Sequence, residues 1–151
     1  SAQRTVWKRF CNAVGNVVDP ATGSAVAGVL SADGSNIISV QEAFAEAAAE
    51  MPLRTNTTIS CIVTNAKLDK AQATKVSQMA ADAYAHAIRP THTTNDGDTI
   101  YTLASGKLDT QTSATVPLDL LGMLAVRALQ TAIVNGAKTA KTSHGIPGAA
   151  K

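Results

Sequence analysis

MPLRTNTTISCIVTN, residues 51–65, contains the stretch that decides the fold, because its second half alternates in the way a β-strand does. Pro52 discourages a helix, and the residues after Asn56 are rich in β-branched side chains, which favour strands. Successive side chains of a strand point to opposite faces. One face would carry Thr57, Ile59, Cys61 and Val63, and the other Thr58, Ser60, Ile62 and Thr64. Thr57 is therefore predicted to stand at the first position of a strand.

The tripeptide Asn56-Thr57-Thr58 at the start of this strand has three interpretations. It is an N-glycosylation sequon, an ordinary polar strand start, or a peptide bond that the protein cuts in itself to create a new N-terminal threonine. The residues alone leave all three open.

Helices and strands alternate along the rest of the chain. The predicted elements are strand 14–18, helix 40–50, strand 57–63, helix 69–88, strand 99–104 and helix 116–134. Asp69 and Gln72 form a capping box at the start of helix 69–88, whose apolar side chains recur every three or four residues. This order predicts an α/β (α+β) layered sandwich.

Helix 116–134 is apolar on nearly every side, which predicts burial on both flanks. The few predicted strands offer too little sheet area to cover it. We therefore expect these residues to be part of a larger folding unit.

The composition excludes several classes of protein. With 151 residues, 45% of them hydrophobic, the chain is expected to bury one core. The net charge is only +2 and the lysines are scattered, so no nucleic-acid surface is expected. The longest apolar segment, 116–134, is interrupted by Asp119, Arg127 and Gln130, so no membrane span is expected.

Cys11 and Cys61 are too few for a disulfide framework or a zinc site, and both are expected to be buried thiols. The amino terminus has no recognisable secretory signal, so a cytoplasmic location is expected.

The histidines do not predict a metal centre. His86 and His92, taken together with Asp96 and Asp98, match no known ligand spacing and straddle a predicted helix end. We expect His86 on a helix surface, His92 as a hydrogen-bonding loop residue, and no metal or other cofactor.

A threonine at a chain terminus has unusual chemistry, because its own free amine can act as the base that activates its hydroxyl. Breaking the bond before Thr57 would expose such an amine. Thr57 could attack the Asn56 carbonyl itself, move the acyl group from nitrogen to oxygen, and let water complete the cut.

Four segments give the chain a family resemblance. They are MPLRTNTTISCIVTNAKLDKAQ (51–72), AIRPTHTTNDGDTIYTLASG (87–106), HGIPG (144–148) and CNAVGNVVDP (11–20). Together they resemble the DmpA-type aminopeptidases (L-aminopeptidase/D-esterase, β-peptidyl aminopeptidase), and most closely the nylon-oligomer hydrolase branch. Members of this family cut one precursor into α and β chains, and in that branch the β chain begins with Thr preceded by Asn.

The resemblance implies a division of the chain and a complete fold. Residues 1–56 would be the C-terminal segment of the α chain and 57–151 the β chain, together forming part of one domain. The complete fold would be a four-layer αββα sandwich of the N-terminal-nucleophile type, of which this chain is only the C-terminal part. A missing N-terminal α-chain segment is thus an expected partner.

The resemblance also implies four catalytic residues. Thr57 would be the nucleophile, Asp96 and Asp98 would hold and tune it and its amine, and Asn12 would donate to the oxyanion. An uncharged amide donor suits a charge that exists only in the transition state. Asn12 is preferred to Asn16, which lies within an apolar run.

Two departures from the family pattern concern the substrate. Thr94-Asn95 stands where the family commonly has apolar or aromatic residues, which indicates a more polar pocket wall. Lys8 and Arg9 also interrupt a strand that is apolar in the family. The substrate-binding residues are unknown at this point.

The sequence therefore predicts a self-processing amide hydrolase that acts on peptides or ω-amino-acid oligomers such as nylon fragments. Family members assemble into tetramers or larger rings, so a homo-oligomer is expected. The alternative is a non-catalytic scaffold or oligomerisation domain that retains the fold.

Overall fold

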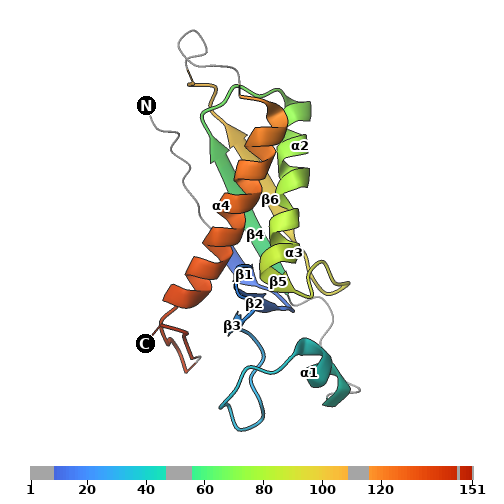
Figure 1. Ribbon diagram of the computed structural model, residues 1–151, viewed down its shortest axis with the longest axis vertical. Helices are drawn as coiled ribbons and strands as arrows, with labels where there is room; N and C mark the ends of the chain where they lie inside the picture. Colours follow the sequence, from blue (N-terminus) through green and yellow to red (C-terminus); the bar gives the residue numbers. More distant parts are fainter. Residues whose placement is uncertain (1–8, 47–55, 109–115, 146, 151) are drawn as a thin grey trace.

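A computed structural model describes residues 9–46, 56–108, 116–145 and 147–150. Its strands are β1 (Arg9–Asn12), β2 (Asn16–Val18), β3 (Ala25–Ala27), β4 (Thr57–Thr64), β5 (Ile88–Arg89) and β6 (Thr99–Ala104). Its helices are α1 (Val40–Glu46), α2 (Lys70–Ala80), α3 (Asp82–Ala87) and α4 (Leu118–Thr139). The described residues form a mixed α/β structure, consistent with the α+β class (Figure 1).

The main sheet, here called sheet A, has the strand order β1-β4-β6. β1 pairs with β4 in the antiparallel sense, and Asn12 lies opposite Thr57. β4 pairs with β6 in the parallel sense, from Ile59 opposite Thr99 to Thr64 opposite Ala104. Parallel neighbours need a long crossover, and α2 and α3 provide it.

The two faces of β4 follow the predicted alternation. Thr58, Ser60, Ile62 and Thr64 are buried, with at most 7% of each residue exposed. Their neighbours Thr57, Cys61 and Val63 are half-buried and Ile59 is exposed. We call the side of Thr58, Ser60 and Ile62 the covered face, and the side of Thr57, Ile59 and Cys61 the open face.

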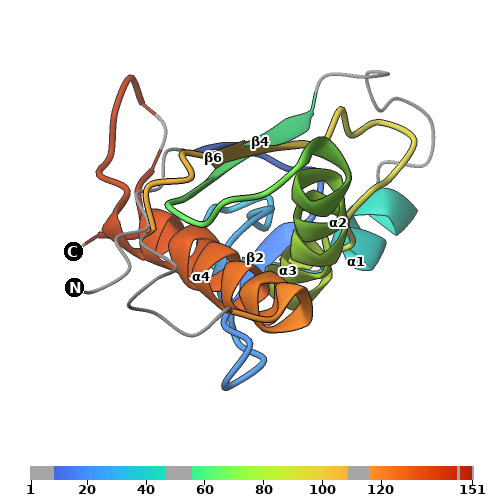
Figure 2. The same cartoon turned by 90° about the horizontal axis from the view of Figure 1, so that it is seen from above.

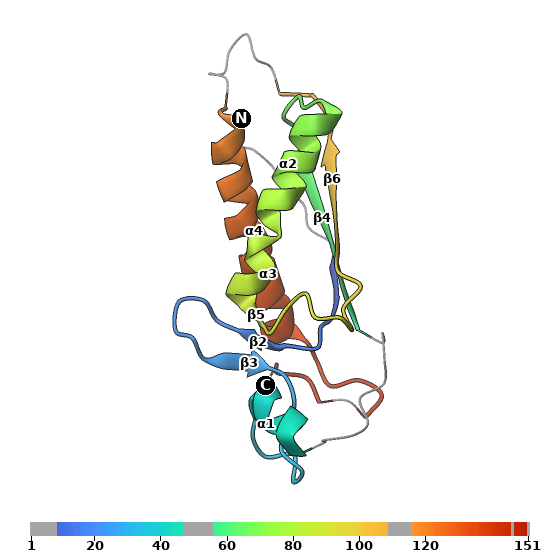
Figure 3. The ribbon, with the colours of Figure 1, turned by 90° about the vertical axis from the view of Figure 1, so that its right-hand side faces the viewer.

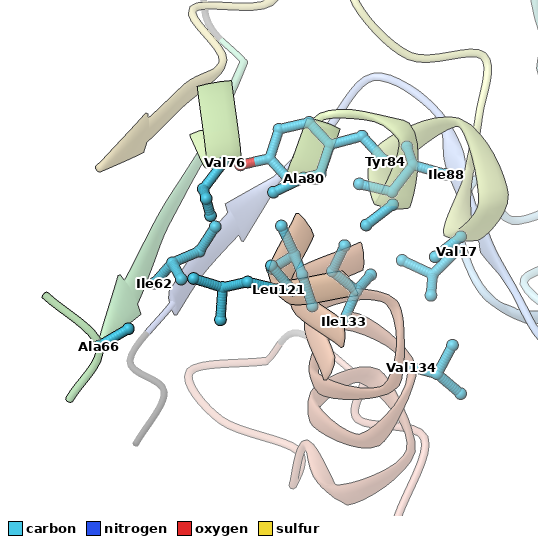
Figure 4. Close-up of a cluster of buried hydrophobic side chains, with 14 residues drawn as sticks. Val17, Ile62, Ala66, Val76, Ala80, Tyr84, Ile88, Leu121, Ile133 and Val134 are labelled. Atoms are coloured by element: carbon cyan, nitrogen blue, oxygen red, sulfur yellow. The ribbon is translucent and has the colours of Figure 1, made fainter. Parts of the chain in front are cut away.

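Helices α2, α3 and α4 lie on the covered face of sheet A (Figures 2 and 3). The core between them is built from small and medium side chains, with Tyr84 as its largest fully buried member (Figure 4). Gly122 allows α4 to approach α2 closely, since a β-carbon there would lie 2.3 Å from Met79 Sδ. Close packing of small residues replaces aromatic anchors in this core.

The predicted capping box is present at the start of α2. Asp69 accepts from the backbone N–H of Gln72, and Gln72 accepts from the backbone N–H of Asp69. The single helix predicted for 69–88 is divided at Ala81 into α2 and α3. Tyr84 N–H bonds to the carbonyl of Ala81, three residues back, so the chain tightens locally at this point.

α4 is buried on one side only, which corrects the prediction of burial on both flanks. Leu121, Leu129 and Ile133 lie in the core, whereas Leu120, Met123 and Leu124 are at least 41% exposed. By length and hydropathy alone α4 would be able to cross a membrane, a criterion that core helices of other proteins also meet. Its buried stripe packs on α2, α3 and the sheets.

A second small sheet has the order β3-β2-β5 and lies at the end of the molecule where β4 begins (Figure 1). The residue patterns did not predict β1, β3 and β5, which have only two to four residues each, although the family resemblance implied a strand ahead of Asn12. Asn16 is buried in β2, where its side chain donates to Ile38 O at 2.7 Å and accepts from Val29 N at 3.0 Å. Asn16 therefore holds the 24–39 loop in place.

Sheet A and helices α2, α3 and α4 thus form two layers, one of sheet and one of helices. The open face of sheet A bears Ile59, Tyr101 and Leu103, whose exposed fractions are 41%, 58% and 58%. These large apolar side chains are therefore exposed on one face of the sheet.

Candidate active site

The start of β4 meets the loop that leads into β6. Because β4 and β6 are parallel, their first residues lie at the same edge of sheet A. A parallel bridge between Asn56 and Asp96 extends this pairing beyond the strands. Segments about 40 residues apart in sequence are thereby brought together around Asn56 and Thr57.

The Asn56–Thr57 peptide bond has two hydrogen-bond donors on its carbonyl oxygen. Thr57 Oγ1 donates to Asn56 O at 2.6 Å, and the backbone N–H of Gly97 donates to the same oxygen at 2.9 Å. Both Asn56 and Thr57 are half-buried. The hydroxyl of Thr57 thus lies against the carbonyl group that it would have to attack.

Asp98 is fixed beside the backbone of β4. Its Oδ1 accepts from Thr58 N at 2.9 Å, while its Oδ2 lies 2.9 Å from His92 Nδ1 and accepts more weakly from Thr91 Oγ1 at 3.4 Å. The Asp98 side chain is 8% exposed, and that of His92 is 46% exposed. This carboxylate therefore has donors for both oxygens, as a nearly buried charge requires.

Asp96 has a different set of partners. Its Oδ1 accepts from Val14 N at 3.2 Å, and its Oδ2 accepts from the backbone N–H of Thr93 at 3.0 Å and from Thr93 Oγ1 at 2.7 Å. Asp96 thus ties the loop before β6 to the turn after β1. The two carboxylates lie on adjacent parts of one loop, yet each is held by its own partners.

Asn12 lies directly opposite Thr57 in the β1–β4 ladder. The structure places its backbone next to the proposed nucleophile, while its side chain falls outside the described part. Asn16, the other asparagine of this region, has both ends of its amide occupied by the loop it holds.

Two residues near the site had no catalytic assignment from the sequence. The Tyr84 hydroxyl donates to Ser60 Oγ at 2.7 Å beneath β4, and its ring lies 5.5 Å from that of His92. His92 has a φ of 55°, a left-handed conformation that is uncommon for a residue with a side chain. Tyr84, His92 and Asp98 lie in contact under the start of β4. The contact of His92 with Asp98 agrees with the expectation that His92 is a hydrogen-bonding loop residue, whereas Tyr84 had no signal in the sequence.

The remaining candidates lie away from these contacts. His86 is exposed and contacts Gln130 on α4 at 3.0 Å. Cys61 is a half-buried free thiol on the open face, so the expectation of burial was wrong for it, and the Cys11 side chain is outside the described part. Among the described residues, no group of three or more His, Cys, Asp or Glu side chains is placed to hold a metal ion.

Comparison with known proteins gives a consistent result. The pattern of peptidase family S58 matches residues 4–150. An uncharacterized aminopeptidase of Mycobacterium tuberculosis is 34% identical over an alignment of 151 positions that covers 90% of this chain and 44% of that protein. The 6-aminohexanoate-oligomer endohydrolase of Paenarthrobacter ureafaciens is 33% identical over 121 residues, or 78% of this chain and 33% of the enzyme.

The corresponding endohydrolase of a Kocuria strain is 29% identical over 109 residues. The chain spans less than half the length of the curated relatives it matches. The match to the S58 pattern nevertheless runs almost from end to end, and it confirms the family that the motifs around Asn12, Thr57 and Asp96 indicated. This chain belongs to peptidase family S58, the DmpA family.

Proposed function

We propose that the chain is the C-terminal part of a self-processing amide hydrolase that cuts itself between Asn56 and Thr57 and then uses Thr57 as an N-terminal nucleophile. The observation that carries the proposal is the 2.6 Å contact between Thr57 Oγ1 and the carbonyl oxygen of Asn56 at the start of β4. Family membership supports a hydrolase.

Self-cleavage would proceed through an ester. Thr57 Oγ bonds to the Asn56 carbonyl carbon, the C–N bond to Thr57 breaks, and the hydroxyl proton ends on the Thr57 nitrogen. Water then attacks the ester carbon and releases the Thr57 hydroxyl. The products are a C-terminal Asn56 carboxylate and an N-terminal Thr57 amine.

Substrate turnover would reuse the same atoms. The new amine accepts the hydroxyl proton while Oγ attacks a substrate amide, and the acyl-Thr57 ester is resolved by water. Asp98 already accepts from the amide N–H of Thr58, so the amine one residue earlier would lie beside a fixed negative charge. We assign Asp98 and Asp96 to holding this amine and its surroundings, and the Asn12 side chain to the substrate oxyanion.

The proposed substrate class is taken from the names of the similar proteins. Their names describe an aminopeptidase and a 6-aminohexanoate-oligomer endohydrolase. We propose amides of small or unbranched amino-terminal units, either peptides or ω-amino-acid oligomers. No cofactor is required, because the nucleophile and its base come from one residue.

The complete protein is proposed to be a four-layer αββα sandwich. The exposed apolar side chains on the open face of sheet A support a second sheet packed there, supplied by an N-terminal α-chain segment. In this division residues 1–56 end the α chain and 57–151 form the β chain. We propose a cytoplasmic homo-oligomer, a tetramer or larger.

Mass spectrometry of the full-length protein tests the proposal. The parent should split between Asn56 and Thr57, Thr57→Ala should stay whole and inactive, and Thr57→Ser should split at a reduced rate because it retains the hydroxyl. Thr58→Ala is the matched control, because its side chain is on the covered face. A parent that stays intact would favour a scaffold domain, and a split Thr57→Ala variant would remove Thr57 as the nucleophile.

A further inference from the structure

The backbone N–H of Gly97 points at the atom where charge would develop during self-cleavage. It donates to the carbonyl oxygen of Asn56 at 2.9 Å, while the hydroxyl of Thr57 contacts the same oxygen at 2.6 Å. When Oγ bonds to the carbonyl carbon, the electron pair of the C=O bond moves onto this oxygen. A donor already in place stabilises such an oxyanion without rearrangement.

We propose that the Gly97 N–H is a catalytic oxyanion donor, first for cleavage of the Asn56–Thr57 bond and then for substrate hydrolysis at Thr57. This inference rests on the proposed function, and it adds a catalytic group that the side-chain motifs do not reveal. The donor is a backbone N–H, which every residue except proline has. The residue type at position 97 therefore affects the donor only by changing the space and the backbone geometry around it.

The position of this N–H is fixed from both sides. On one side, Asp96 bonds to Val14 and Thr93, and the bridge between Asn56 and Asp96 continues the pairing of sheet A. On the other side, Asp98 bonds to the backbone of Thr58. The two aspartates therefore hold the peptide unit between them, a role they would have even before any free amine exists.

A glycine is required at position 97 because the nucleophile lies against it. A β-carbon built on Gly97 would lie 2.9 Å from Thr57 Oγ1, closer than real β-carbons approach such atoms. Any side chain would displace the hydroxyl from the Asn56 carbonyl. Gly97 thus combines an N–H donor on the oxyanion with open space for the attacking oxygen.

The same donor would serve turnover, because the two reactions share a carbonyl position. Self-cleavage and substrate hydrolysis both pass through an acyl ester on Thr57 Oγ. Once the Asn56 carboxylate has left, the carbonyl oxygen of a substrate amide would take the place of Asn56 O. The acyl unit of the substrate would then extend the line of β4 beside Asp96, as Asn56 does in the uncut chain.

Replacing the peptide N–H by an ester oxygen tests the donor directly. Cell-free translation of the full-length chain with glycolic acid at position 97 replaces this N–H by an oxygen that cannot donate, and it also makes the Asp96 carbonyl a weaker acceptor. Glycolic acid at position 34 is the matched control, since the Gly34 N–H also makes one backbone hydrogen bond, to Ser31 O at 2.7 Å, in an exposed turn. Self-cleavage is followed by mass spectrometry, and folding of both proteins by resistance to protease.

We expect cleavage to be at least ~100-fold slower with the ester at 97 and unchanged with the ester at 34. Equal rates in two folded proteins would overturn the role of Gly97 while leaving Thr57 as the nucleophile. A parent chain that never splits would remove the proposed function and this inference together.

Gly97→Ala provides a second test, in which the N–H remains but the space for the hydroxyl is lost. We expect slow cleavage, because the added β-carbon would push the Thr57 hydroxyl away from the Asn56 carbonyl. Normal cleavage by Gly97→Ala would contradict the close approach.

Discussion

The two faces of sheet A differ in what their side chains contact. On the covered face, Thr58 and Ser60 are each 1% exposed and lie under the helices, and the hydroxyl of Tyr84 bonds to Ser60. On the open face, Tyr101 and Leu103 are 58% exposed. The side chains of the covered face are buried and hydrogen-bonded within this chain. The open face has exposed apolar side chains, and the Thr57 hydroxyl lies at its edge. The difference indicates that the core described here lies on the covered face, while the apolar side chains of the open face have no such cover among the described residues.

The largest expected effect comes from Asp98→Asn, which removes charge at the edge where the open face begins. Without the carboxylate, the protonated amine of Thr57 loses its stabilisation, so turnover should fall by about 10²–10⁴-fold. Self-cleavage should be slowed less, because no free amine exists before the cut. Amide hydrolysis and mass spectrometry of one sample separate the two steps.

Asp119→Asn, in the exposed first turn of α4, removes an equal charge and should change neither step. Normal turnover by Asp98→Asn would show that another group stabilises the protonated amine of Thr57.

Leu103→Glu tests whether the open face is covered in the longer protein. In residues 1–151 alone the side chain is largely exposed, so the free energy of unfolding should change by less than about 0.5 kcal/mol. If a second sheet packs there in the full-length protein, a buried unpaired charge should cost about 3 kcal/mol. Urea unfolding of both lengths measures the contrast, and Gln78→Glu on the exposed side of α2 adds the same charge as a control. If Leu103→Glu changed the free energy of unfolding equally in residues 1–151 and in the full-length protein, the open face would not be covered in the full-length protein.

Tyrosine-to-phenylalanine changes on opposite faces form a matched pair. Tyr84→Phe removes the donor to Ser60 in the fully buried core and should cost about 1–3 kcal/mol of stability. In residues 1–151, Tyr101→Phe removes a hydroxyl from the exposed Tyr101 of β6 and should cost close to nothing. Thermal melting of the two variants measures the difference. A similar loss of stability in both variants would show that burial does not determine how much a tyrosine hydroxyl contributes to stability.

The smallest expected effect is that of Asp19→Asn, far from either face of β4. Asp19 accepts from Lys138 on α4 at 2.6 Å, and this hydrogen bond, together with one from the backbone of Ala21, lowers the pKa of the Asp19 carboxyl below 3.8. Because the folded pKa is depressed, the stabilisation is present above pH 3.8 and lost as the pH falls through the folded value. The variant should melt slightly below the parent at pH 7 and together with it in strong acid. A difference that persists in acid would assign the effect to packing.

The fold was predictable where its elements are long and periodic. The alternation of β4 and the capping box of α2 gave both elements and their faces, and β6 was predicted with its observed bounds. β1, β3 and β5 have too few residues for a period to be visible, and they form only because longer elements position their partners. Burial of α4 on both flanks was predicted from its apolar content. Apolar content indicates that a helix face favours burial, but it does not tell whether another element of this chain covers that face.

The catalytic roles given to the site residues stay a prediction, while the structure shows which of their segments lie together. The resemblance indicated Thr57, Asp96 and Asp98, and the parallel pairing of β4 with β6 brings their segments together. The separate partners of the two carboxylates depend on the geometry of the 90–98 loop, which no spacing encodes. The contact between Tyr84 and His92 crosses between elements and has no periodic pattern.

The strand order of the two sheets has a consequence for the fate of a cut molecule. β1, from before the Asn56–Thr57 bond, pairs with β4 from after it, and β2, from before the bond, pairs with β5 from after it. Cutting that bond would leave each fragment with strands in both sheets, so neither fragment could complete a sheet without the other. The two fragments would separate in denaturant and migrate as one complex in native buffer. Fragments produced apart would gain their structure only by complementation.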